Sequence, residues 1–167
     1  MMSLLIASFV SMIGIFCIPF LRKTLHPLEI LTCGLLVASL DQFSYAILTL
    51  NLEFIKASEN PYEFWALKLE QIFIAPVLIL LGVFVFFSES LRPLGKAFIL
   101  TGFVFLLLAV TYCYDRSGII QFVKWRWSSE WLRDAALLAV SIGFLMLFRK
   151  FLKWQGVSRD PVSSDSL

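Results

Sequence analysis

The chain alternates between long apolar runs and short connections that contain most of its charged residues. Runs of about 20 apolar residues are long enough to cross a hydrocarbon core of about 30 Å as helices. The runs lack the period-two alternation that is typical of strands in a membrane barrel. The pattern therefore predicts an all-α membrane bundle of five transmembrane helices, at about residues 3–21, 28–50, 66–88, 97–114 and 133–152.

Local sequence signals refine the interpretation of two of these runs, the third and the first. Asn60, Pro61 and Glu63 form a helix start, with a capping side chain, a proline in the first turn and a carboxylate three residues after the cap. The third helix therefore begins before its apolar core, and Pro76 is expected to kink it. The first run lacks a preceding basic residue and a following small-x-small cleavage site, so it is interpreted as a permanent helix rather than a cleaved signal peptide.

Composition agrees with this interpretation, because 59% of the residues are hydrophobic and only 16% are charged. These values exclude an ordinary soluble domain. We predict a single transmembrane domain over residues 1–154. The polar segment 155–167 is expected to be a disordered cytoplasmic tail.

Basic residues and tryptophans predict how the helices sit in the membrane. No basic residue precedes the first run, whereas Arg22 and Lys23 follow it directly, and one side of the membrane collects eight basic residues against six on the other. The excess of basic residues marks the cytoplasmic side, so the N-terminus is expected outside and the C-terminus inside. All five tryptophans fall in connections or at helix ends, which is typical of an aromatic belt.

The tryptophan-rich stretch 119–131 has two interpretations. Its apolar residues recur at helical spacing, which predicts a short amphipathic helix lying in the outer interface. The favoured alternative is a loop that anchors the last two helices among lipid headgroups. A third hypothesis gives Lys124, Arg126 and Arg133 a role in binding an anionic lipid or ligand.

Asp41 lies near the middle of the second run, where an ionisable carboxyl costs several kcal/mol unless it is neutral or partnered. Gly34, Ala38, Asp41 and Tyr45 share one helical face, so the carboxyl is expected to point into the bundle. No arginine or lysine is predicted at the same depth, which favours a neutral carboxyl hydrogen-bonded by Tyr45 or a neighbouring helix. Its role is then helix packing or, alternatively, the handling of a proton or cation.

Further polar residues gather towards the outer ends of the predicted helices. The candidate intramembrane polar site consists of Asp41, Tyr45, Glu70, Gln71 and Asp115. A wider set is predicted either to form a vestibule above Asp41 or to be ordinary helix-end charges; it adds Lys68, Tyr112, Tyr114, Arg116, Arg133 and Asp134.

Residue types that support catalysis are scarce. The three cysteines are scattered singly through the apolar runs, and His26 is the only histidine. The chain has no phosphate-binding loop, zinc motif or nucleophile elbow. We therefore predict no enzyme activity, catalytic residue, cofactor or metal; a lipid-modifying enzyme using Asp41, Glu70 or Asp115 is disfavoured. Basic residues follow the membrane surface rather than a groove, so nucleic acid is not an expected partner.

Three short segments carry a resemblance to a known group. They are the run from His26 to Gln42, in which Glu29 and Asp41 are twelve residues apart, the pair Pro76 and Val77, and the sequence G-I-I-Q-F-V-K-W from Gly118. Together they resemble an uncharacterised family of small multi-helix membrane proteins of spore-forming Gram-positive bacteria. The W-R-W-S-S-E-W stretch departs from that pattern. The resemblance implies architecture and a bacterial plasma-membrane location, and no activity.

The leading functional hypothesis is a non-catalytic, multi-pass protein of the bacterial plasma membrane that acts as a packing, assembly or sensory partner. Membrane lipids are its expected partners, with another membrane protein or a second copy as further candidates. The alternative is a small proton- or cation-linked carrier or channel-like subunit that uses Asp41.

Overall fold

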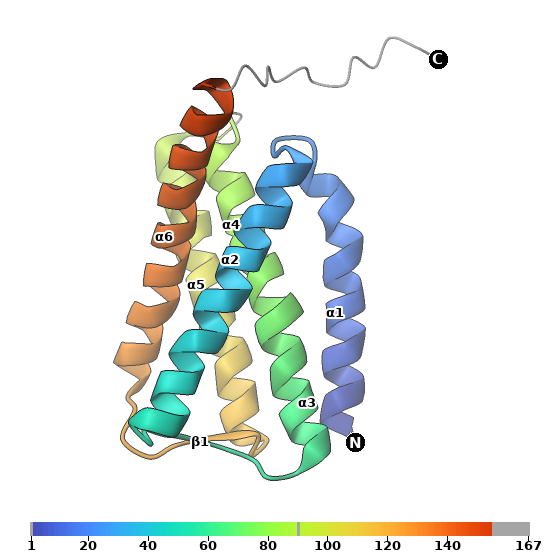
Figure 1. The fold of residues 1–167 in the computed structure, drawn as a ribbon, viewed down its shortest axis with the longest axis vertical. Helices are drawn as coiled ribbons and strands as arrows, with labels where there is room; N and C mark the ends of the chain where they lie inside the picture. Colours follow the sequence, from blue (N-terminus) through green and yellow to red (C-terminus); the bar gives the residue numbers. More distant parts are fainter. Residues whose placement is uncertain (1, 90, 155–167) are drawn as a thin grey trace.

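The computed structural model describes residues 2–89 and 91–154, which form a bundle of five long helices (Figure 1). All five are long and apolar enough to cross a membrane, so the predicted all-α bundle is confirmed and the chain is a multi-pass membrane protein. The segment predicted to be a polar tail, 155–167, lies outside the described residues. In chain order the long helices are α1 (Met2–Leu21), α2 (Pro27–Ala46) with its π-helical extension η1 (Ile47–Asn51), the continuous helix made of α3 (Pro61–Leu69), η2 (Glu70–Ile74) and α4 (Ala75–Phe87), α5 (Pro93–Arg116), and α6 (Trp127–Trp154).

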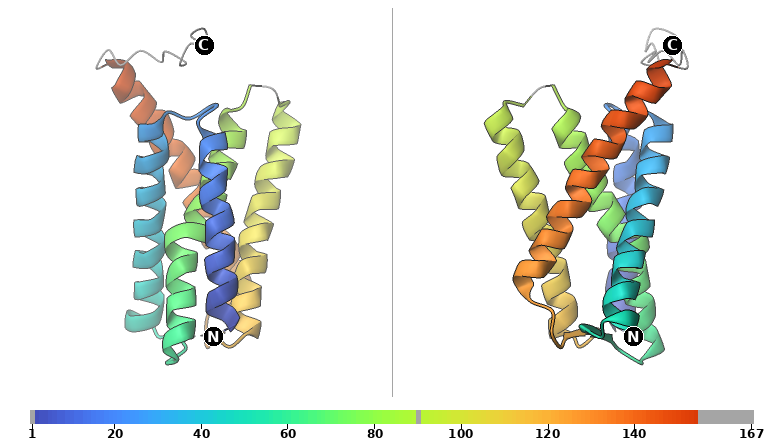
Figure 2. Two further views of the ribbon diagram at one scale, coloured as in Figure 1. Left: turned by 90° about the vertical axis from the view of Figure 1, so that its right-hand side faces the viewer. Right: turned by 60° about the vertical axis from the view of Figure 1, so that its left-hand side comes forward.

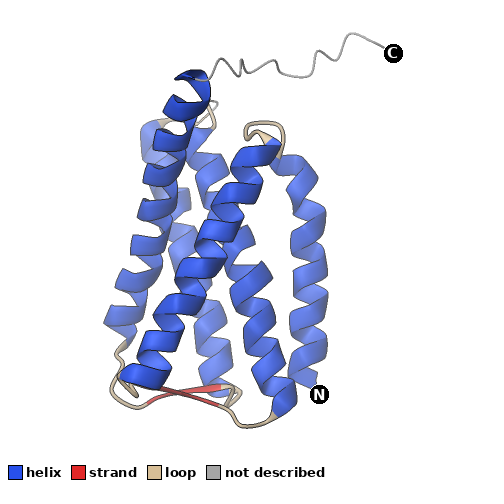
Figure 3. Ribbon diagram, in the orientation of Figure 1, coloured by secondary structure: helices blue, strands red, loops and turns tan. Residues whose placement is uncertain are grey.

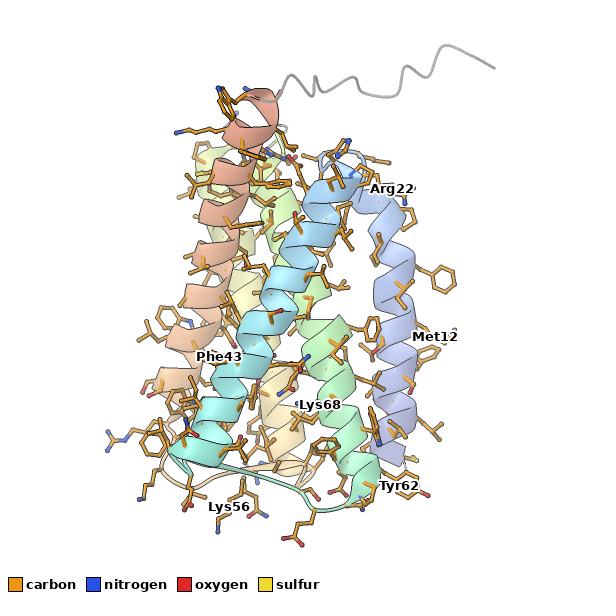
Figure 4. All side chains as sticks on the ribbon, in the orientation of Figure 1. Met12, Arg22, Phe43, Lys56, Tyr62 and Lys68 are labelled. Carbon is orange, nitrogen blue, oxygen red and sulfur yellow. The ribbon has the colours of Figure 1, made fainter. Side chains whose placement is uncertain are left out.

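Successive helices run in opposite directions, and the start of α1 lies at the same end of the bundle as the ends of η1 and α5 (Figures 1 and 2). We call this end the β end, because two short strands close it. The helix formed by α3, η2 and α4 is central: 56% of its most apolar window is buried, against 17% for α1 and α5. The outer helices therefore expose large apolar side chains such as Met12 of α1 to lipid (Figure 4).

The central helix begins where the sequence predicts. Asn60 Oδ1 accepts a hydrogen bond of 3.1 Å from the Tyr62 amide, and Pro61 occupies the first turn. Further along, the helix widens into the π-helical segment η2 directly before the turn that contains Pro76. A proline leaves the carbonyl four residues earlier without its usual donor, and a wide turn is one way for a helix to accommodate this. The predicted disturbance at Pro76 is therefore a π-helical segment.

Two short strands, β1 (Ile55–Ala57) and β2 (Ile120–Phe122), pair antiparallel across the β end with Lys56 opposite Gln121 (Figure 3). The carbonyl of Phe54 also accepts hydrogen bonds from the amides of residues 123, 124 and 125. The interpretation of residues 119–131 as one amphipathic helix is therefore wrong. Pairing with a segment about 65 residues earlier in the chain holds residues 120–122 extended, and a local apolar spacing does not reveal such a partner.

The last helix starts at Trp127, six residues before the predicted start at 133. The amides of Ser129 and Glu130 both bond the carbonyl of Arg126, which closes the first turn. The prediction began this helix late because its first two turns are polar. Those turns are nevertheless packed into the bundle, since Glu130 and Asp134 are buried.

Two apolar clusters fill the interior. The larger one joins α2, α4, α5 and α6 through side chains such as Val37, Ile79 and Leu145. The smaller one lies at the β end and packs Ile55 and Ile120 of the two strands against Tyr45 and Leu67. A polar cluster lies beside the smaller of these two cores.

Candidate functional site: a buried carboxyl and guanidinium cluster

Arg133 is the centre of the polar cluster. Since α6 begins at Trp127, Arg133 lies about 9 Å along the helix from its start. Its Nη2 atom is 2.8 Å from Glu130 Oε1, 3.1 Å from Asp134 Oδ1 and 3.5 Å from Asp41 Oδ1. The guanidinium carbon also lies 4.4 Å from the ring centroid of Tyr45. One arginine therefore connects α6 with the buried face of α2.

Four carboxyl groups from three long helices meet here: Asp41, Glu70, Glu130 and Asp134. All four residues are buried, and Asp41 and Glu130 are fully enclosed. We call these four carboxyl groups and Arg133 the Arg133 cluster. Glu70 of η2 interacts electrostatically with Asp41, Arg133, Glu130 and Asp134. The basic groups that face these carboxyls are Arg133 and Lys68. Carboxyls thus outnumber basic groups, and a buried excess of negative charge is unfavourable unless some carboxyls are protonated.

Hydrogen bonding within the cluster is incomplete. Among the described residues, six buried side-chain atoms have no hydrogen-bond partner: both oxygens of Asp41, Glu70 Oε2, Asp134 Oδ2, and Nε and Nη1 of Arg133. Buried polar atoms are normally paired, since each unpaired one costs about 1–3 kcal/mol. The contact of Arg133 with Asp41 is consequently an ion pair at 3.5 Å without hydrogen-bond geometry.

Glu130, in contrast, is held firmly from the β end. Its Oε2 accepts a 2.7 Å hydrogen bond from Trp125 Nε1, and its Oε1 lies 3.5 Å from the Thr111 hydroxyl. Trp125 belongs to the connection after β2, and its ring lies beside that of Phe54. The two-stranded cap is therefore linked directly to the cluster through Trp125.

The π-helical segment η2 carries Glu70 and Gln71, both of which are buried. Lys68, one turn earlier, donates a 2.9 Å hydrogen bond to Gln71 Oε1, and Figure 4 places this lysine between α2 and α3. Short π-helical segments within α-helices are frequent at functional sites. Here the segment brings a carboxyl and an amide of the central helix to the depth of Asp41.

The structure brings together some of the residues predicted as a site and leaves others apart. Asp41, Tyr45 and Glu70 are brought together, and Gln71 joins them through Lys68. Asp115 does not: it lies next to Arg116, and no hydrogen bond or ion pair of the described residues connects it with Asp41 or Glu70. Of the wider vestibule, Lys68, Arg133 and Asp134 reach the cluster, whereas Arg116 bonds Tyr112 at an exposed position and Tyr114 bonds the carbonyl of Ala66.

Two expectations about Asp41 are wrong. The predicted absence of a basic residue at its depth fails because the early start of α6 places Arg133 inside the bundle. Tyr45 is not its hydrogen-bond partner, since both oxygens of Asp41 lack one, and the tyrosine ring instead faces the Arg133 guanidinium. Glu130 was missed altogether. The spacing of Glu130, Arg133 and Asp134, three and four residues apart, is the signal in the sequence that could have revealed it.

A second acidic and basic pair joins α2 to α6 at the opposite end of the bundle. Arg149 Nε bonds Glu29 Oε1 at 2.8 Å, and Arg149 Nη2 bonds Glu29 Oε2 at 3.0 Å. Glu29 also accepts from the backbone amide of His26, which caps α2, and Arg149 reaches the carbonyl of Thr24. The pair is therefore a bidentate ion pair, and its Glu29 carboxylate also takes part in the cap at the start of α2.

The chemistry available to the Arg133 cluster is that of carboxyls and a guanidinium. Among residues 2–89 and 91–154, no group of three or more histidine, cysteine, aspartate or glutamate side chains is placed to hold a metal ion. Buried carboxyls in excess of their basic partners are suited to binding and releasing protons. Comparison of the chain with protein families, curated proteins and solved structures gave no match.

Proposed function

We propose that this protein is a non-catalytic, proton-linked carrier or channel-like subunit of a bacterial plasma membrane, in which the Arg133 cluster binds and releases a proton. The observation that carries the proposal is the state of the Asp41 carboxyl: it is fully buried, yet neither of its oxygens makes a hydrogen bond. Because no hydrogen bond stabilises the ionised form of this carboxyl, protonation breaks none.

Arg133 supports the proposal because it has several partners. When Asp41 is protonated, Glu130 and Asp134 still hold the guanidinium. When Asp41 is ionised, it shares the positive charge with them. Arg133 therefore keeps a carboxyl partner in both charge states of Asp41.

A packing role is the second candidate, and the complete burial of Asp41 favours it. In that case the cluster serves as an anchor between α2 and α6, and the protein acts as an assembly or sensory partner. The Glu29 and Arg149 pair already provides such an anchor for the same two helices with better geometry. We therefore rank packing second for Asp41.

The location and family remain proposals of the same kind. Glu29 and Asp41, the two acidic residues on which the resemblance to spore-former membrane proteins rests, each meet an arginine of α6. This common role gives a physical reason for their spacing on α2.

Proton passage can be tested in proteoliposomes containing a pH-sensitive dye, with a potassium diffusion potential as the driving force. The wild-type chain is expected to acidify or alkalise the lumen faster than empty vesicles, and Asp41→Asn is expected to abolish the difference. Phe43→Leu is the matched control, because Phe43 is an exposed residue two positions away on the same helix. Equal rates for wild type, Asp41→Asn and empty vesicles would contradict proton passage and favour the packing role.

A further inference from the structure

A second feature, independent of the charged cluster, is an apolar groove of about 470 Å³ between α1 and α5. It exists because α1 packs against α3, η2 and α4 rather than closely against α5. Ile6 and Val10 form one wall, Leu106 and Val110 the other, and Ile74 the base. Ile6, Val10 and Leu106 are also exposed at the bundle surface, so the groove opens sideways towards the membrane.

The groove has a polarity gradient along the helices. Its polar lining residues are Ser3 at the start of α1 and Tyr114 and Ser117 at the end of α5, all towards the β end, where the apolar Ile119 lines it as well. The remaining lining towards the membrane centre is apolar. The long axis therefore leads from a polar mouth near the membrane surface to an apolar inner end.

Its depth corresponds to one leaflet. From Ser3 to Val10 is about 10 Å along α1, and from Ser117 to Leu106 is about 16 Å along α5, at 1.5 Å per residue. Half of a hydrocarbon core of about 30 Å is about 15 Å. A molecule with its polar part at the mouth and one apolar chain in the groove would thus match both length and polarity.

We propose that this groove is a binding site for one acyl chain of a membrane phospholipid whose headgroup lies at the β end. A helix of a second copy fits less well, because a helix with its side chains is about 10–12 Å wide and the groove has a volume of about 470 Å³. The bound chain would contact Ile74, the last residue of η2, which is the segment that also carries Glu70.

The test is photocrosslinking in vesicles that contain phosphatidylglycerol with a diazirine at the end of one acyl chain. Peptide mass spectrometry of the wild-type chain should place the adducts mainly at the inner end of the groove, on and beside Val10 of α1 and Leu106 of α5. Adducts spread evenly over the lipid-facing sides of all the outer helices would overturn the proposal. This measurement needs no variant and is therefore independent of any effect of mutation on folding.

Two variants sharpen the result. Ala109→Trp fills the groove, and the groove adducts should fall severalfold. Ala136→Trp is the matched control, because Ala136 is an exposed alanine on α6 at a similar distance from the β end, and it should leave the adducts unchanged. Undiminished groove adducts in Ala109→Trp would overturn the site. A symmetric dimer that meets at the groove would bring the two copies of Cys113, an exposed groove residue, together. Efficient oxidative crosslinking of a chain carrying Cys17→Ala and Cys33→Ala would show such a dimer and would also overturn the proposal.

Discussion

The two acidic and basic contacts between α2 and α6 use the same kinds of residues and are built differently. Glu29 and Arg149 share two short hydrogen bonds, and both have additional backbone partners. Asp41 and Arg133 are 3.5 Å apart, share no hydrogen bond and belong to a cluster with surplus carboxyls. The first contact satisfies its charges and fixes the helices. The second leaves buried polar atoms unpaired, which is the pattern expected where a site is adapted to something other than stability.

The largest effect should follow from breaking the satisfied pair. Arg149→Met leaves the buried Glu29 carboxylate without its two-point partner, and we expect the free energy of unfolding to fall by about 4 kcal/mol. Thermal unfolding in detergent, compared with Lys150→Met at the exposed neighbouring position, measures this loss. A cost no larger than that of the control would mean that the pair does not clamp the helices.

Arg133→Met should lower the free energy of unfolding by less than Arg149→Met does, and the size of the loss should depend on pH. Protonated carboxyls need no cation, so the variant should lose little stability at about pH 5. At about pH 8 the ionised carboxyls of Asp41 and Asp134 are left without their cation, and the loss should be about 3 kcal/mol. The destabilisation therefore grows as the pH rises. Unfolding measured at both pH values gives the difference, and a pH-independent loss would show that the carboxyls of the cluster do not exchange protons.

Trp125→Phe removes the indole donor from Glu130 and preserves an aromatic ring beside Phe54. One oxygen of a buried carboxyl loses its shortest hydrogen bond, so we expect a loss of about 2 kcal/mol. Trp131→Phe, at an exposed position of α6, should change the stability little. If both variants behave alike, the cap is not coupled to the cluster.

Asp41→Asn should have the smallest effect on stability, below about 1 kcal/mol, because the Asp41 carboxyl makes no hydrogen bond and Arg133 keeps two other carboxyl partners. Glu29→Gln, the equivalent change in the other pair, should cost about 2 kcal/mol, since it weakens two short charged hydrogen bonds. Parallel unfolding measurements test the ranking. Equal losses would remove the distinction between the two contacts.

Much of the architecture could be predicted from local sequence. The apolar runs gave the five helices, and Asn60 with Pro61 gave the start of the central one, because apolar length and capping chemistry are properties of adjacent residues. The inward position of Asp41 followed in the same way, from the spacing of small residues on its helical face. These features need no knowledge of which helices are neighbours.

The features that could not be predicted depend on contacts between segments that are distant in the sequence. The pairing of β1 with β2 and the burial of the polar start of α6 arise only when the helices assemble. A helix start that contains Glu130, Arg133 and Asp134 resembles a solvated connection when hydropathy alone is considered. The partner of Asp41 was therefore missed, although the residue itself was found.

The most direct test of the central claim is the protonation of Asp41 in the wild-type protein in lipid, followed by infrared difference spectroscopy of carboxyl bands between about pH 5 and about pH 8. Asp41→Asn assigns the band, and Glu29→Gln controls for the other pair. We predict a carboxyl band that changes reversibly with pH and disappears in Asp41→Asn. A band that stays constant at every pH at which the fold survives would contradict proton exchange and leave Asp41 as a sealed packing contact.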